Sequence, residues 1–175
     1  MHCSFIDLDT HRLRIFFAPH SLVTILPQPT PLIVFIHGLG GQINQFEPLL
    51  KYFCQVADLL CLDLPGCGES PLKDQSWDSY NTEAFVEVVN RVINQKIGNR
   101  KVVLIGHSMG CMIVAKLALK LGHKCLAVVL LCPKTEISEQ ERKGIRLITT
   151  LPEFIFNILR KRDRAYSQLP ELTDH

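Results

Sequence analysis

The sequence has almost no net charge, because 19 Lys and Arg residues oppose 17 Asp and Glu residues and leave +2 at pH 7. A nucleic-acid-binding domain is typically far more basic, with a pI above about 9 and clustered charge. No apolar run reaches the ~18 residues of a membrane-spanning helix, and the first 14 residues lack the regions of a signal peptide. We therefore expect no nucleic-acid partner and a cytoplasmic protein.

The seven cysteines form no C-x-x-C pair and no Cys/His pattern at zinc spacing. A structural zinc site needs such closely spaced ligands, and an odd number of cysteines does not suit a disulfide framework. The cysteines are therefore predicted to be reduced thiols in a reducing compartment. We expect no metal and no other cofactor.

Buried strands alternate with helical patterns along most of the chain. Its 175 residues and 47% apolar composition are those of one domain with a sizeable core. Continuous apolar runs are typical of parallel strands buried on both faces, whereas apolar residues at helical spacing indicate helices. The expected strands are a hairpin in 4–17, then 32–37, 57–66, 102–106 and 125–132, and the expected helices are 46–53, 82–97 and 109–121. This alternation predicts an α/β fold, a mostly parallel central sheet with helices on both faces.

The pattern changes after Pro133. Residues 137–164 show mainly helical spacing, with a break at Pro152 and a basic end. We interpret 1–136 as the N-terminal part of a core domain and 137–175 as a helical, lid-like segment that is cut short. A second interpretation makes 145–164 an interfacial basic helix in contact with a membrane surface, but we favour a lid over an apolar pocket.

A serine between two glycines follows the expected strand 102–106. Gly106, Ser108 and Gly110 form the pattern G-x-S-x-G, and an apolar helix begins directly after it. Such a sharp turn strains the backbone at the serine, holds its hydroxyl above the sheet and leaves no room for side chains at the two glycines. The N-terminal dipole of the helix favours negative charge at the same point. The motif predicts a nucleophile elbow.

A glycine-rich segment follows the first central strand. Its residues are His37, Gly38, Leu39, Gly40 and Gly41. Glycines let backbone N–H groups approach a bound carbonyl, so the N–H groups of Leu39 and Met109 would form an oxyanion hole. One donor of such a hole is worth about 3 kcal/mol of the barrier. We expect His37, Gly38 and Gly40 to shape this segment.

With these motifs in this order, the chain resembles the serine hydrolases of the α/β-hydrolase superfamily. The resemblance covers residues 4 to about 137, and its matching segments are IHGLGG (36–41), LDLPGCGES (62–70) and IGHSMG (105–110). It implies the α/β-hydrolase fold, truncated at its C-terminal side, with Ser108 as the nucleophile. It also implies an ester, thioester or related acyl substrate, and a structural role for Asp63 in holding the turn 65–70.

The sequence places no residue to complete a catalytic triad. In this family the acid and the histidine both follow the nucleophile. Of the later histidines, His123 is expected on the surface and His175 is the last residue. His107 should face away from the serine hydroxyl and pack in the core. Glu136 and Asp163 stay open as acids, without a further strand to deliver a histidine.

Two hypotheses therefore remain open. The first is a serine hydrolase of small-molecule or lipid-like acyl substrates whose chain is cut short, and which is poorly active because a serine without a base is a weak nucleophile. The second is a non-catalytic binding or regulatory protein that keeps the front half of the fold. A chain cut short would leave strand 125–132 with an apolar, unpaired edge, so we expect it to be poorly stable or to associate, whereas a stable monomer would favour the second hypothesis.

Overall fold

A computed structural model describes residues 2–9, 11–19, 30–71 and 77–133, together with 139, 140 and 143. The chain divides into two units, Met1–Lys134 and Thr135–His175. Apart from those last three positions, the expected lid-like segment 137–175, with the stretch 145–164, lies outside the described residues. No helix among the described residues is long and apolar enough to cross a membrane.

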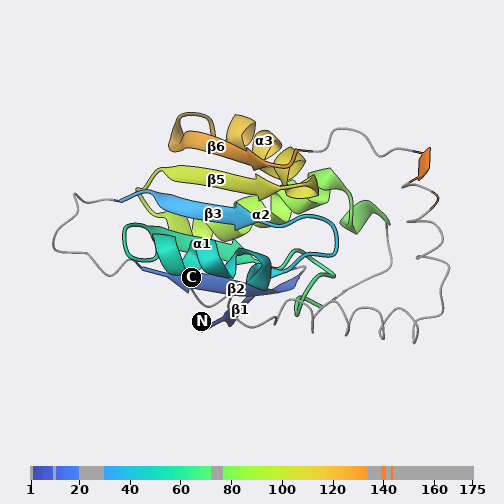
Figure 1. Cartoon of the computed structure of the whole chain (residues 1–175), viewed down its shortest axis with the longest axis horizontal. Helices are drawn as coiled ribbons and strands as arrows, with labels where there is room; N and C mark the ends of the chain where they lie inside the picture. The colour runs from blue at the N-terminus through green and yellow to red at the C-terminus, as the bar shows by residue number, and fades with distance from the viewer. Residues whose placement is uncertain are drawn as a thin grey trace, which may run out of the picture. The chain divides into compact units, whose positions relative to one another are not determined.

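Six described strands of the first unit form one sheet, in the order β1-β2-β4-β3-β5-β6 (Figure 1). They are β1 (Ser4–Asp7), β2 (Arg12–Ala18), β3 (Leu32–Ile36), β4 (Asp58–Leu62), β5 (Val102–His107) and β6 (Cys125–Leu131). Strands β4, β3, β5 and β6 are parallel, whereas the β1–β2 hairpin pairs antiparallel with β4. The predicted mostly parallel sheet and its leading hairpin are confirmed.

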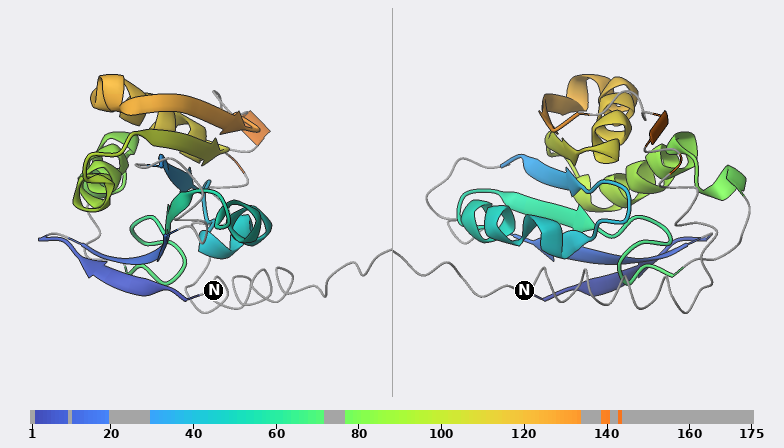
Figure 2. Two further views of the ribbon diagram at one scale, coloured as in Figure 1. Left: turned by 90° about the vertical axis from the view of Figure 1, so that its left-hand side faces the viewer. Right: turned by 45° about the vertical axis from the view of Figure 1, so that its right-hand side comes forward.

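Helices cover both faces of this sheet, as predicted. They are α1 (Glu47–Phe53), preceded by the 3-10 turn η1 (Ile43–Phe46), then α2 (Thr82–Ile97) and α3 (Met109–Leu121). Figure 2 shows α1 on one side of the sheet and α2 and α3 on the other. Because successive strand residues point to opposite faces, Val34 packs in the core beneath α2 and α3, while Phe35 packs against η1 and α1.

Helix α2 begins and ends at the residues that the sequence indicates. The side chain of Asn81 accepts a hydrogen bond from the Ala84 N–H at 2.8 Å and so caps the first turn. Its apolar stripe, which includes Phe85, Val89 and Val92, is buried. The helix ends at Gly98, whose φ of +56° few other residues adopt. Local sequence and tertiary packing therefore agree along this helix.

The parallel register brings three loops to one edge of the sheet. Ile36, at the end of β3, pairs with Leu62 on one side and with Gly106 on the other. The loops that follow β3, β4 and β5 therefore start side by side at the carboxyl ends of the strands. This is the edge at which ligands bind in open α/β sheets.

Strand β6 exposes apolar side chains on both of its faces. Leu126, Val128, Val129 and Leu130 are between 37% and 54% exposed, and no described strand pairs with the outer side of β6. The strand carries no charge, whereas the other edge of the sheet carries an Arg12–Asp7 ion pair. An uncharged, apolar edge strand is a template for pairing with another chain.

We expect the 175-residue chain to self-associate through β6. Size-exclusion chromatography with light scattering should show a mass that rises with concentration, and Val129→Lys should lower the associated fraction because an edge lysine disfavours strand pairing. Phe5→Lys on β1 is the matched control, since Phe5 is 44% and Val129 is 40% exposed. A monodisperse wild-type monomer would contradict this expectation.

Candidate active site

Ser108 lies in a strained turn between β5 and α3. Its backbone has φ +51° and ψ −118°, and its hydroxyl does not cap the helix. A positive φ at a residue with a side chain costs on the order of 1–3 kcal/mol and persists only where the surroundings hold it. One such contact is the Ser108 N–H, which donates to the Leu131 carbonyl of β6 at 2.9 Å. Ser108 is half-buried, at the carboxyl edge of the sheet.

The two glycines of the elbow, residues 106–110, lie where no side chain fits. A Cβ added at Gly106 would lie 2.5 Å from the Gly110 carbonyl oxygen, and one added at Gly110 would overlap the Ile36 carbonyl oxygen of β3. Both contacts involve backbone atoms, which cannot rotate away as a side chain can. The glycines therefore let α3 start directly over β3 and β5.

The glycine loop, residues 38–41, folds against this elbow. Its turn is closed by a hydrogen bond from the Gly41 N–H to the Gly38 carbonyl at 3.1 Å, and Gly40 has φ +68°. A Cβ added at Gly38 would lie 3.0 Å from the Cβ of Ser108. Leu39 is 68% exposed at the tip of the turn. Met109 is the first residue of α3, where N–H groups have no carbonyl partner within the helix.

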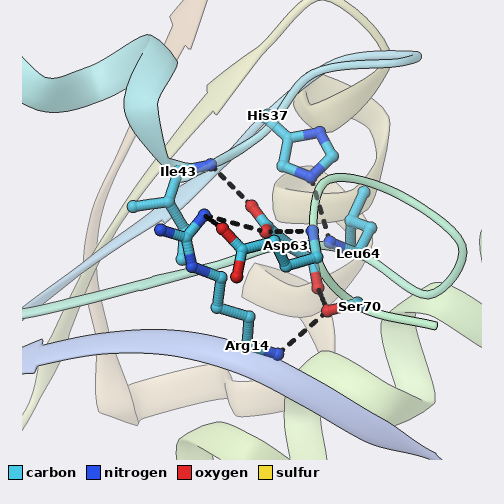
Figure 3. Close-up of polar contacts among 7 residues, drawn as sticks. Arg14, His37, Ile43, Asp63, Leu64 and Ser70 are labelled. Atoms are coloured by element: carbon cyan, nitrogen blue, oxygen red, sulfur yellow. Dashed lines mark hydrogen bonds and ion pairs between the residues drawn. The ribbon is translucent and has the colours of Figure 1, made fainter. Parts of the chain in front are cut away.

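His37 is fully buried, and both of its ring nitrogens are engaged. Nε2 accepts a hydrogen bond from the Leu64 N–H at 3.0 Å (Figure 3). Nδ1 lies 2.7 Å from the Gly38 carbonyl oxygen. Because Nε2 accepts, Nδ1 carries the proton and donates to that carbonyl. Burial lowers the pKa of His37, so the ring is neutral. His37 thus joins the start of the glycine loop to the backbone that follows β4.

Asp63 is the centre of a buried network that joins three segments (Figure 3). Its Oδ1 accepts from the Ile43 N–H at 2.7 Å, its Oδ2 accepts from the Glu69 N–H at 2.9 Å, and Arg14 Nη1 lies 3.5 Å from Oδ2. The Ser70 hydroxyl donates to the Asp63 carbonyl at 2.7 Å. These bonds confirm that Asp63 holds the turn 65–70, and they also attach η1 to it.

One expectation about the neighbouring histidine is wrong. His107 does not pack in the core: it is half-buried, and its Nδ1 accepts from the Gln45 side-chain amide at 2.7 Å. Gln45 was not singled out by any sequence pattern. His123 lies exposed in the turn η3 (Gly122–Lys124), as expected. Glu136, Asp163 and His175 lie outside the described residues.

A family model described as the alpha/beta hydrolase fold matches residues 31–157. The chain belongs to the α/β-hydrolase family. An abhydrolase domain-containing protein of Schizosaccharomyces pombe is 33% identical over 141 residues, which cover 77% of this chain and 39% of that protein. Lipid droplet hydrolase 1 of Saccharomyces cerevisiae is 35% identical over 104 residues, which cover 49% of this chain and 26% of that protein. This hydrolase-family chain thus spans less than half the length of either relative.

Solved structures agree on the fold. An alpha/beta hydrolase from Novosphingobium aromaticivorans superimposes with a TM-score of 0.69 at 20% identity, over 83% of this chain and 48% of that one. At this level of identity the likeness concerns the fold alone. Within the described part of this α/β hydrolase, no group of three or more His, Cys, Asp or Glu side chains could hold a metal ion.

Replacing Gly68 should separate steric overlap from backbone strain. Gly68 and Gly98 have nearly the same φ, +53° and +56°, but a Cβ added at Gly68 would overlap the Asp63 carboxylate, whereas one at Gly98 would meet nothing within 4 Å. We expect Gly98→Ala to cost about 1–3 kcal/mol of unfolding free energy, and Gly68→Ala about 2 kcal/mol more. Urea denaturation measures both, and equal losses would contradict the described position of Asp63.

His37 should make the hydrolase fold less stable as the pH falls. Burial lowers the pKa of folded His37 below its ordinary value of 6.5. Below pH 6.5 the unfolded chain therefore binds a proton at this residue that the folded chain does not bind. We expect His37→Gln to remove up to about 1.4 kcal/mol per pH unit of this slope below pH 6.5, down to the lowered pKa of the folded ring. Gln can replace both hydrogen bonds, and the exposed His123→Gln is the control. An unchanged slope in His37→Gln would contradict the buried neutral ring.

Proposed function

We propose that this chain carries the nucleophile and the oxyanion hole of a serine hydrolase that acts on an ester, thioester or related acyl substrate. The observation that carries the proposal is the strained backbone of Ser108 in direct contact with the glycine loop. Strain of this kind is retained where a functional side chain must be held in one place. The name of the yeast relative, lipid droplet hydrolase 1, supports a lipid-like acyl substrate.

In this mechanism the Ser108 hydroxyl attacks the carbonyl carbon of the substrate and forms a tetrahedral intermediate. The N–H groups of Leu39 and Met109 donate to its oxyanion, and the start of α3 contributes a favourable dipole. Collapse of the intermediate releases an alcohol or thiol, and water then removes the acyl group from the serine. A general base must take the serine proton at the first step and give it to the departing oxygen or sulfur when the intermediate collapses.

Two of the described histidines are poorly suited to be that base. His37 uses both ring nitrogens inside the fold, and His123 lies exposed in η3, after the end of α3. Because the acid and the histidine follow the nucleophile in this family, we infer that both come from outside the described residues. The same observation favours the second candidate function, a binding or regulatory protein that keeps the elbow and the glycine loop without turnover.

The 175-residue chain should hydrolyse p-nitrophenyl acetate no faster than its Ser108→Ala variant, because no described residue is placed to act as the base for the hydroxyl. Incubation with a fluorophosphonate should still modify Ser108 slowly. Imidazole, supplied as an external base, should accelerate this modification about tenfold or more. Peptide mass spectrometry measures the adduct, with the exposed Ser4 as an internal control in the same molecule.

Two results would overturn parts of this proposal. Imidazole-dependent labelling of Ser108 that does not exceed that of Ser4 would contradict the hydrolase and favour the binding protein. Hydrolysis well above the Ser108→Ala rate without imidazole would show that the chain supplies its own base.

A further inference from the structure

We propose that Gln45 is a positioning residue that holds the glycine loop against the elbow through its hydrogen bond to His107, an inference that rests on the function proposed above. The two side chains come from elements 62 residues apart in sequence, the turn η1 and the end of β5. The Gln45 amide nitrogen lies 2.7 Å from His107 Nδ1. Since the amide donates, His107 Nδ1 accepts, and a neutral ring carries its proton on Nε2.

The glycine loop touches both members of this pair. A Cβ added at Gly41 would lie 2.6 Å from the Gln45 side-chain oxygen, and one added at Gly38 would lie 3.3 Å from His107 Nδ1. The two ends of the loop are therefore packed against the two side chains. The hydrogen bond between Gln45 and His107 completes a closed ring of contacts that includes the loop. This ring includes the residue that directly precedes Ser108.

The backbone that carries Gln45 is itself held firmly. The Ile43 N–H donates to Asp63 Oδ1 at 2.7 Å, and the side chains of Ile43 and Phe46 are buried on either side of the exposed Gln45. Gln45 therefore extends from a fixed turn toward His107. Through it, the Asp63 network reaches the residue next to the nucleophile.

A restraint of this kind matters because the loop is rich in glycine. Glycine adopts many backbone conformations, so the closing bond of the turn alone does not fix where the Leu39 N–H points. A misplacement of about 1 Å can cost about a hundredfold in rate. The loss of one exposed, neutral hydrogen bond should have a smaller effect on the rate than this. We expect it to slow acylation of Ser108 about threefold to tenfold.

Three variants test the role of the hydrogen bond. Gln45→Met keeps the length of the side chain but cannot donate, and Gln45→Glu can accept from a His107 proton on Nδ1. Gln42→Met, at the residue before η1, is the control, since the Gln42 side chain does not cap η1. The readouts are imidazole-assisted fluorophosphonate labelling of Ser108, the His107 tautomer by nitrogen-15 NMR, and hydrogen exchange at the Gly41 N–H.

We expect the wild-type chain to hold His107 as the Nε2–H tautomer. Gln45→Met should lose this preference, label about threefold to tenfold more slowly and exchange the Gly41 N–H faster by a similar factor. Gln45→Glu should restore labelling to within about twofold, with the proton on Nδ1, and Gln42→Met should match the wild type. If Gln45 only stabilised the fold, Gln45→Glu would not recover labelling together with a His107 proton on Nδ1.

The outcomes separate this inference from the proposed function. Labelling and Gly41 exchange that are unchanged in Gln45→Met would overturn the positioning role while leaving the hydrolase proposal intact. A wild-type Ser108 that is not labelled, together with Gly41 protection that Gln45→Met abolishes, would overturn the hydrolase and support Gln45 as the residue that holds the loop.

Discussion

A buried carboxylate is tolerated only where hydrogen bonds and a counter-charge replace its water, and Asp63 obtains these from three separate segments. Arg14 of β2 supplies the charge, Ile43 at the start of η1 supplies one N–H, and Glu69 supplies another. The requirement of one side chain thus ties the hairpin edge of the sheet to two loops at its carboxyl edge. With η1 fixed, the glycine loop before it has a firm end on one side and His37 on the other.

The strain at Ser108 depends on β3 and β6. A residue at φ +51° relaxes unless its neighbours prevent it, and here Gly110 lies directly against the β3 carbonyl while the Ser108 N–H bonds to Leu131. Relaxing the turn would move the start of α3 and break the bond to β6. The strained serine therefore depends on the packed glycines, and the elbow depends on the sheet beneath it.

Periodicity and glycine placement predict most of the fold and the backbone of the candidate site, because these signals are local. Buried runs mark β3, β4 and β5, and G-x-S-x-G marks the elbow. The Gln45–His107 pair leaves no such signal, since it joins positions 62 apart through side chains that lie in no periodic pattern. The rule that side chains alternate along a strand misplaced His107, because β5 ends at this residue and the turn at Ser108 follows. The role of Asp63 is predicted from the family resemblance and not from a local pattern, because a single acidic residue after a strand does not reveal which N–H groups will surround it.

The geometry of the candidate site restricts the class of ligand more than it restricts the reaction that could follow binding. N–H groups directed at one point stabilise negative charge on an oxygen, whether that oxygen belongs to a tetrahedral intermediate or to a bound carboxylate. If Leu39 and Met109 donate as proposed, both candidate functions share the same ligand class, a carbonyl or carboxylate oxygen above Ser108. What separates an enzyme from a binding protein on this scaffold is a base that takes the serine proton, since without it the oxyanion hole and binding retain only residual catalysis. His37 cannot become that base without giving up the Leu64 and Gly38 bonds that hold the glycine loop in place. If the site is catalytic, its base is therefore a residue other than His37.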